Sequence, residues 1–153
     1  MSYTELIPPE AVLLDLKASS QAEVLEALAE RLGQLDPVLS GRREELVRAL
    51  EERERQGSTA SRRVAIPHIK LEGVEKVSVV MAIHREGVDF HALDGDPVHV
   101  FFSVVRPLEK ADQHLGLLRW IAEIAQHQDF VSFALQARDE RQVVDLLSEL
   151  SPA

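Results

Sequence analysis

Apolar residues recur at two different spacings along the chain, and each spacing predicts a different kind of element. From residue 24 to residue 35 they follow the three-and-four spacing of an amphipathic helix. The residues just before it, Ser20 to Glu23, have the form of an N-terminal capping box, in which side chains bond free backbone N–H groups. Gly33 and the Asp36-Pro37 pair are expected to end this helix.

A second helix is predicted from about residue 42 to just before Gly57, with Leu46, Val47 and Leu50 as its buried side chains. Arg53 follows Leu50 by three residues and therefore extends the apolar face of this helix. A charge in that position is costly unless another group pairs with it. We therefore expect a partner for Arg53, and a glutamate of the same helix is one candidate.

Two β-rich runs, 77–83 and 98–105, carry almost no charge, which is typical of central strands that are covered on both faces. Residues 93–97 provide a turn between them. Shorter strands are expected at 11–16 and 64–66, and further helices at about 111–127, 130–137 and 140–150. The mixture predicts an α/β fold, with a single domain over residues 1–153 and helices layered around one sheet.

Composition disfavours several classes of function. The chain has 153 residues and a formal net charge of −9, which argues against nucleic-acid binding. It has no cysteine, so it forms no disulfide and has no thiol chemistry, which suits a cytoplasmic protein. The sequence shows neither a signal peptide nor an apolar run long enough to enter and cross a membrane.

The sequence has six histidines, and none of them forms a His-x-His or His-Glu-x-x-His pattern, so no metal site is expected. Glycine loops for nucleotides and a serine nucleophile elbow are also absent, so no cofactor is expected. His84, His91 and His99 lie on or near the ends of predicted strands and are expected at the surface. His127 is expected at a helix C-terminus, where it suits the helix dipole.

His68 is the candidate for chemistry. It follows Pro67, which fixes its own φ and keeps Ile66 out of the helical region, so the histidine lies on a defined, non-helical corner. Neutral imidazole is a good nucleophile near pH 7, and cationic residues on both sides favour an incoming anion. The pattern indicates a histidine that meets phosphate, and the alternative is a solvated histidine in a loop.

Three segments together resemble a known family. They are Arg53-Glu54-Arg55-Gln56-Gly57-Ser58-Thr59, Val64-Ala65-Ile66-Pro67-His68 and His114-Leu115 ahead of a leucine-rich helix. The chain is similar here to the enzyme IIA domain of the fructose and mannitol type, part of the bacterial phosphoenolpyruvate-dependent phosphotransferase system. Residues 6–16 look most like its nitrogen-regulatory branch.

The resemblance implies a mixed sheet flanked by helices and a phosphoryl group carried on His68. It implies the histidine-containing phosphocarrier protein as donor and, in the sugar-transport branches, a cysteine of an enzyme IIB domain as acceptor. Since this chain has no cysteine, any acceptor must be another protein. Three functions stay open: a regulatory phosphoryl carrier, a sugar-transport IIA subunit, and a binding module of the same fold without phosphotransfer.

The resemblance also assigns supporting residues. Arg53 can bond phosphate through two N–H groups, although a salt bridge to Glu52 or Glu54 is the alternative. His114, in the first turn of a helix if Asp112 caps it, is expected to point inward, stay neutral and donate one hydrogen bond to a phosphoryl oxygen. The alternative for His114 is a core histidine bonded to a carbonyl.

The loop before His68 departs from the family pattern. Ser58 and Thr59 either bind phosphoryl oxygens or merely satisfy a turn. Many relatives have glycines after this pair, whereas this chain has Ala60-Ser61 and then two arginines, Arg62 and Arg63. We expect these arginines to dock the phosphate donor. Glu54 and Arg55 read as the solvated face of a helix and are expected to be dispensable.

Overall fold

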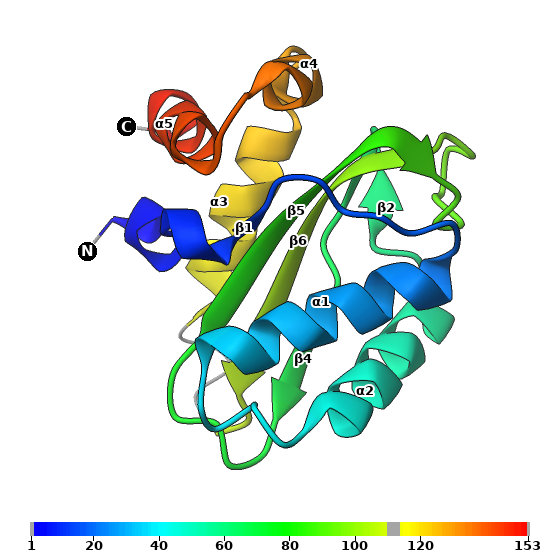
Figure 1. Cartoon of the computed structure of the whole chain (residues 1–153), viewed down its shortest axis with the longest axis vertical. Coiled ribbons are helices and arrows are strands. Elements are labelled where there is room, and N and C mark those ends of the chain that lie inside the picture. The colour runs from blue at the N-terminus through cyan, green and yellow to red at the C-terminus, as the bar shows by residue number, and fades with distance from the viewer. Residues whose placement is uncertain (1, 110–113, 153) are drawn as a thin grey trace.

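Within residues 2–109 and 114–152, which the computed structural model describes, six strands form one mixed sheet (Figure 1). The two apolar runs become β5 (Ser78–Val88) and β6 (Val98–Pro107), which pair antiparallel at its centre. The short strands are β1 (Val12–Leu13), β2 (Ala60–Ser61), β3 (Val64–Ala65) and β4 (His68–Leu71). β1 runs parallel to β5, and both β3 and β4 run parallel to β6. The predicted α/β fold with central strands at both apolar runs is confirmed.

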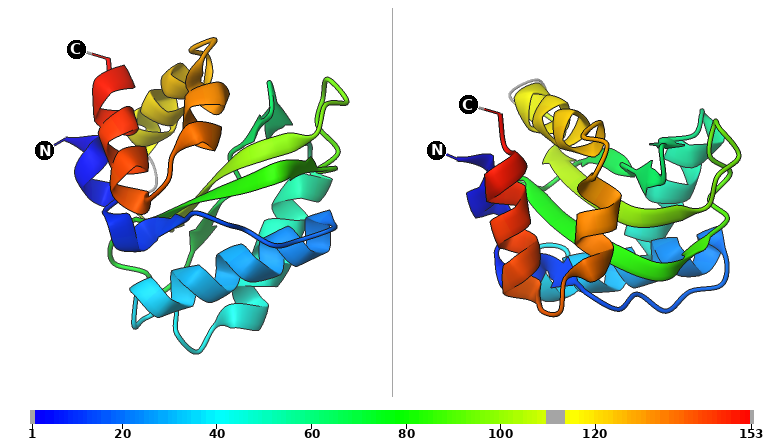
Figure 2. Two further views of the ribbon diagram at one scale, coloured as in Figure 1. Left: turned by 45° about the horizontal axis from the view of Figure 1, so that its top comes forward. Right: turned by 90° about the horizontal axis from the view of Figure 1, so that it is seen from above.

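Helices cover both faces of this sheet (Figure 2). α1 (Gln21–Leu35) and α2 (Arg43–Arg55) lie on one face. α3 (Leu115–Ala125), α4 (Phe130–Gln136) and α5 (Glu140–Leu150) lie on the other. Two short 3₁₀ helices, η1 (Tyr3–Leu6) and η2 (Pro9–Ala11), precede β1. Helices were predicted in all five regions, and residues 111–113 of the predicted long helix lie outside the described part of the chain.

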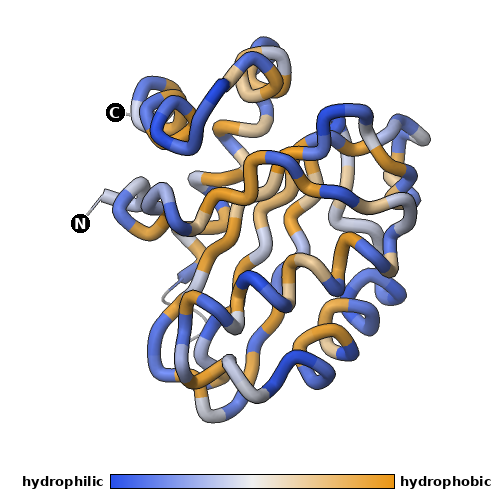
Figure 3. The backbone as a smooth tube through the Cα atoms, in the orientation of Figure 1, coloured by the Kyte–Doolittle hydropathy of each residue, from blue (hydrophilic) through white to orange (hydrophobic). Residues whose placement is uncertain are grey.

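The alternation of side chains along β6 divides the interior into two cores. Phe101 and Val105 pack with α1 and α2, whereas Phe102 and Val104 pack with α3, α4 and α5. Figure 3 shows the central strands as largely apolar, while polar and apolar residues alternate along α1 and α2. Because both faces are buried, apolar residues can follow one another along the central strands, as the sequence indicated.

The N-terminus of α1 is capped nearly as predicted. The Ser20 hydroxyl accepts a hydrogen bond from Glu23 N over 3.2 Å, but the Glu23 carboxylate accepts from Ser19 N, one residue earlier than a capping box requires. α1 ends at Leu35 with Asp36 as its C-cap, so the predicted end at Asp36-Pro37 is confirmed, whereas Gly33 lies inside the helix and does not end it. A Cβ on Gly33 would lie 3.4 Å from the carbonyl oxygen of Leu39, so this glycine lets the following loop approach the helix.

The surface position expected for His84 and His99 is also wrong. β5 continues five residues past its predicted end, so His84 lies inside this strand. His99 lies on β6, and both histidines are buried. The Nε2 of His84 donates to the carbonyl of Ala18 over 2.6 Å, and the Nδ1 of His99 donates to the carbonyl of His84 over 3.1 Å. Burial, with the charge of Arg63, lowers the pKa of His99. His91 is exposed, as predicted.

Candidate functional site

His68 is the first residue of β4 rather than part of a loop corner. β3 ends at Ala65 and β4 begins after Pro67, which has no N–H to give to the ladder, so the two short strands follow one another along β6. His68 pairs with Val104 of β6. Among the described strands β4 pairs with β6 alone, so His68 lies at an edge of the sheet.

An open hollow of about 420 Å³ lies at this edge of the sheet, next to His68. The next residue, Ile69, points into the core under α1 and α2, so alternation turns His68 toward the opposite side of the sheet. The hollow is lined by Ala49, Glu52 and Arg53 of α2, its C-cap residue Gln56, His68, Ile69 and Lys70 of β4, and Arg106 of β6. Two arginines therefore share a concave site with the candidate nucleophile.

The tautomer of His68 follows from one contact. Its Nδ1 lies 2.6 Å from the carbonyl oxygen of Ile66. A carbonyl oxygen only accepts hydrogen bonds, so Nδ1 carries the hydrogen and the lone pair of the neutral ring lies on Nε2. The Ile-Pro-His sequence thus holds the ring by a bond to the residue before proline and leaves Nε2 to react.

The surroundings of His68 also favour its neutral form. Burial lowers the pKa of His68 from its ordinary value of 6.5, and the positive charges of Arg53 and Arg106 lower it further. The hydrogen bond to Ile66 acts in the opposite direction and is outweighed. At neutral pH the ring is therefore an uncharged base and nucleophile.

Arg53 lies where its place on the apolar face of α2 predicted, half-buried beside His68. Its Nη1 donates to the carbonyl oxygen of Gly57 over 2.9 Å, which satisfies a backbone group just beyond the helix. Within the described residues it forms no ion pair with Glu52 or Glu54: Glu52 pairs with Arg55, and Glu54 binds Thr59. The expected salt bridge is absent there, and Arg53 instead faces the hollow.

The Ser58–Thr59 pair is bonded locally. Thr59 donates from its backbone N and from its hydroxyl to the Glu54 carboxylate, over 3.1 and 2.7 Å. The Ser58 hydroxyl accepts from Ala60 N over 3.1 Å. The description of Glu54 as a purely solvated helix residue is therefore wrong, because it closes the turn that leads from α2 to β2. A phosphate-binding role for the two hydroxyls stays a prediction.

His114 directly precedes α3 and occupies its N-cap position, so the helix begins one residue after it. Asp112, which was expected as the cap, lies outside the described residues. His114 is half-buried. Burial lowers its pKa, and the charge of Arg106 lowers it further, so the ring is neutral at pH 7. The predicted protonation state agrees with this direction.

Arg106 is the site residue that sequence reasoning missed. The predicted strand stopped at residue 105, one position before it, although β6 runs to Pro107. It lines the hollow beside His68, and its charge lowers the pKa of both His68 and His114. The available signal was a single arginine at the end of an uncharged strand, eight residues before His114.

Arg62 and Arg63 form the two-residue turn between β2 and β3, with φ of 54° and 69°. Positive φ at both positions is the geometry of a type I′ hairpin turn, which Asn and Gly normally occupy. The Arg63 carbonyl accepts from His99 N, five positions before the Val104 that pairs with His68. At about 3.3 Å per residue this separates the turn from His68 by roughly 16 Å along the sheet. Both arginines therefore lie outside the hollow around His68, and their docking role stays a prediction.

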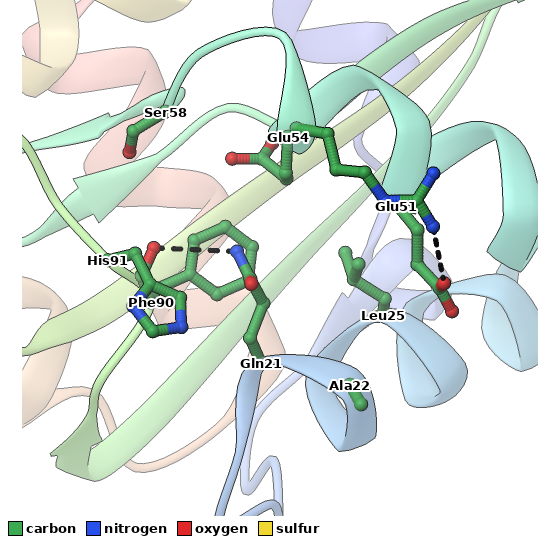
Figure 4. A pocket seen from close by; sticks show the side chains of 9 residues that line it. Gln21, Ala22, Leu25, Glu51, Glu54, Ser58, Phe90 and His91 are labelled. Atoms are coloured by element: carbon green, nitrogen blue, oxygen red, sulfur yellow. Dashed lines mark hydrogen bonds and ion pairs between the residues drawn. The ribbon is translucent and has the colours of Figure 1, made fainter.

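A second hollow, of about 360 Å³, lies between the start of α1, the end of α2 and the chain after β5 (Figure 4). Figure 4 shows Gln21, Glu54 and His91 around it, with Gln21 bonded to the carbonyl oxygen of Phe90. Ser58 lines this hollow and not the one beside His68. Its carboxylates, Glu51 and Glu54, disfavour an anionic ligand there.

Within residues 2–109 and 114–152, no three His, Asp or Glu side chains lie close enough together to hold a metal ion. No helix in the described ranges combines the length and the apolar character needed to cross a bilayer.

The fold and site together define a class of protein: a small α/β domain that presents a neutral histidine, the candidate nucleophile, beside permanently charged arginines. The family model described as phosphoenolpyruvate-dependent sugar phosphotransferase system, EIIA 2, matches residues 5–150. The chain belongs to this family of enzyme IIA domains, which are phosphotransfer carriers.

Two curated relatives represent different branches of the family. A nitrogen regulatory protein from Bradyrhizobium diazoefficiens is 35% identical over 155 residues, covering 100% of this chain and 98% of the relative. A fructose-specific EIIA component from Haloferax volcanii is 32% identical over 129 residues, covering 84% of this chain and 80% of the relative. The sequence is therefore similar to members of both a nitrogen-regulatory and a sugar-specific branch.

Solved structures agree with the fold. The nitrogen regulatory protein IIA-Ntr from Neisseria meningitidis superimposes with a TM-score of 0.83 at 25% identity, covering 94% of this chain and 97% of that one. Mannitol IIA from Escherichia coli superimposes with a TM-score of 0.74 at 21% identity, covering 92% and 97%. The second likeness concerns the fold alone.

Proposed function

We propose that this protein accepts a phosphoryl group on Nε2 of His68 and passes it to another protein. The observation that supports this most directly is the hydrogen bond from Nδ1 of His68 to Ile66, which leaves the lone pair of a neutral ring on Nε2. The two arginines of the adjacent hollow supply positive charge where the three phosphoryl oxygens would lie.

The transfer is balanced without any co-reactant. The Nε2 lone pair forms a bond to phosphorus while the bond from phosphorus to a donor histidine nitrogen breaks, and that electron pair stays on the donor ring. Nδ1 of His68 keeps its hydrogen throughout. Because one nitrogen–phosphorus bond replaces another, the step runs readily in both directions, and catalysis rests on positioning and on charge stabilisation.

Arg53 and His114 support this reaction in our proposal. Arg53 uses one N–H for Gly57 and keeps others for phosphoryl oxygens. His114, neutral through burial and through Arg106, donates one ring hydrogen to a phosphoryl oxygen. Ser58 and Thr59 would bind the phosphoryl group only if their hydroxyls exchanged their present local hydrogen bonds for hydrogen bonds to phosphoryl oxygens.

We assign the histidine-containing phosphocarrier protein as donor and a regulatory, nitrogen-type role in the cytoplasm. The names of the relatives from Bradyrhizobium and from Pseudomonas aeruginosa, the latter 32% identical over 127 residues, support the regulatory branch. The second candidate is sugar transport, supported by the fructose-specific relative. Mannitol IIA from Escherichia coli forms a complex with phosphorylated enzyme IIB, and a IIB domain would be the acceptor in that case.

The test is a reconstituted relay. The protein is incubated with phosphoenolpyruvate, enzyme I and the phosphocarrier protein, and the intact mass is measured. Addition of one phosphoryl group, dependent on every upstream component, is expected. An unchanged mass in the complete mixture would contradict the proposed phosphoryl transfer. The remaining function would be that of a binding module with the same fold but without phosphotransfer. Transfer onward to a IIB cysteine would favour sugar transport over regulation.

A further inference from the structure

Arg106 has a position in the fold that no other described cation shares. It pairs in register with Lys70 of β4, and by alternation along β6 it lies on the same side of the sheet as Phe102 and Val104. That is the side from which α3 and its N-cap residue His114 cover the sheet. Lys70 is exposed, whereas Arg106 is only 5% exposed.

Its place beside His68 is the second observation. Arg106 lines the same hollow as His68 and Arg53. Burial lowers the pKa of His68 and of His114, and the Arg106 charge acts on both rings in the same direction. Arg106 therefore borders the hollow beside the edge strand that carries His68, on the side of the sheet that α3 covers.

We propose that Arg106 is a phosphoryl-binding residue, whose guanidinium contacts the oxygens of the phosphoryl group on Nε2 of His68 from the side of β6. This inference rests on the proposed function, since it needs His68 to be the carrier. Arg53 approaches the same group from α2, so the phosphoryl group would be held by guanidinium groups from two different elements.

The chemistry of arginine fits this role. A guanidinium is charged at every physiological pH and offers five N–H donors in a planar fork, so it can bond a protein group and phosphoryl oxygens together. Before transfer, its charge helps to keep His68 neutral and nucleophilic. After transfer, the same charge faces the negative oxygens. One residue thus favours both the reactive form of the ring and its product.

The experiment compares Arg106→Gln with Arg119→Gln, which removes the same charge from the exposed surface of α3. Phosphorylation by the phosphocarrier protein is followed at saturating donor. We expect Arg106→Gln to slow transfer by roughly tenfold to hundredfold, the range for loss of one charge-assisted hydrogen bond, and Arg119→Gln to match the wild type. Equal rates in all three proteins would overturn the inference while the wild-type labelling left the proposed function intact.

A second readout separates contact from mere structural support. The phosphorus NMR signal of the phosphorylated protein is titrated to find the second ionisation of the phosphoryl group. Contact with Arg106 lowers that pKa, so it should rise in Arg106→Gln and, because the fork is lost, also in Arg106→Lys. Arg106→Lys keeps the positive charge, so it replaces Arg106→Gln in both measurements if the glutamine variant fails to fold. A slow variant with an unchanged phosphoryl pKa would make Arg106 a positioning residue for His114 and overturn the proposal.

Discussion

The Nδ1 of His68 and the carbonyl oxygen of Ile66, separated by 2.6 Å and by one proline in the sequence, fix the tautomer of the ring. The carbonyl belongs to the residue that proline forces out of the helical region, so the turn geometry and the bond support each other. The consequence is that the lone pair of the neutral ring lies on Nε2 before any partner arrives.

The first prediction concerns the titration of His68. Because burial and two arginines lower its pKa, the ring should titrate below 6.5, measured by NMR of the ring protons and nitrogens. The neutral ring is then the major form above about pH 6.5 and is lost as the pH falls through the folded pKa. Arg53→Gln should move the midpoint upward, but not to the ordinary value, since burial is the largest cause. A wild-type midpoint above 6.5 would contradict the site electrostatics.

The second prediction concerns Arg53 and His114. Arg53→Gln and His114→Ala should each lose a charge-assisted hydrogen bond worth roughly 1.5–3 kcal/mol in the transition state, which slows phosphorylation by about tenfold to hundredfold. Quenched-flow measurements at saturating phosphocarrier protein give the rate of phosphorylation. Both variants should fold. The matched control is Arg55→Gln, two residues from Arg53, exposed and paired with Glu51 and Glu52. If Arg55→Gln abolishes labelling while Arg53→Gln does not, the arginine assignment is wrong.

The third prediction separates docking from chemistry at the β2–β3 turn. Replacing both Arg62 and Arg63 by serine should lower the second-order rate of phosphorylation, with a difference that shrinks as salt rises, because charge steering acts on association. The rate at saturating donor should stay the same, since the turn lies far along the sheet from His68. A loss at saturation that salt does not alter would place an arginine on the phosphoryl group.

A companion variant controls for the turn itself. Arg62→Asn with Arg63→Gly removes both charges and supplies the residues that positive φ favours. The two substitutions should raise the free energy of unfolding by about 1–2 kcal/mol, judged from the cost of left-handed backbone in ordinary residues. The variant should still associate slowly with the phosphocarrier protein, because it lacks both charges. Normal association by this variant would show that turn geometry, and not charge, sets docking.

Most of the fold followed from periodicity because local pattern and burial agree. The two uncharged runs could only be central strands, and Ser20 marked the start of α1. β4 was missed because His68–Leu71 is too short to show a strand period and Pro67 separates it from β3. His84 and His99 were misplaced because a strand end cannot be located from sequence when polar residues continue inside the sheet.

The site was predicted in part for the same reason. His68, Arg53 and His114 were predicted through motifs, and the structure brings Arg53 into the same hollow as His68. The bond from His68 to Ile66 and the position of Arg106 needed the parallel register of β4 on β6, which joins segments far apart in sequence. The separation of Arg62 and Arg63 from His68 came from that register too, since closeness in sequence had suggested closeness in space.

The most direct test of the central claim is the identity of the nitrogen that carries the phosphoryl group. Protein labelled with ¹⁵N is phosphorylated through the relay, and phosphorus–nitrogen coupling is read by NMR on wild type and on His68→Ala. We predict one adduct, on Nε2 of His68, labile in acid, stable in base and absent from His68→Ala. An adduct on Nδ1, or full labelling of another histidine in His68→Ala, would contradict the assignment of His68 Nε2 as the phosphoryl carrier.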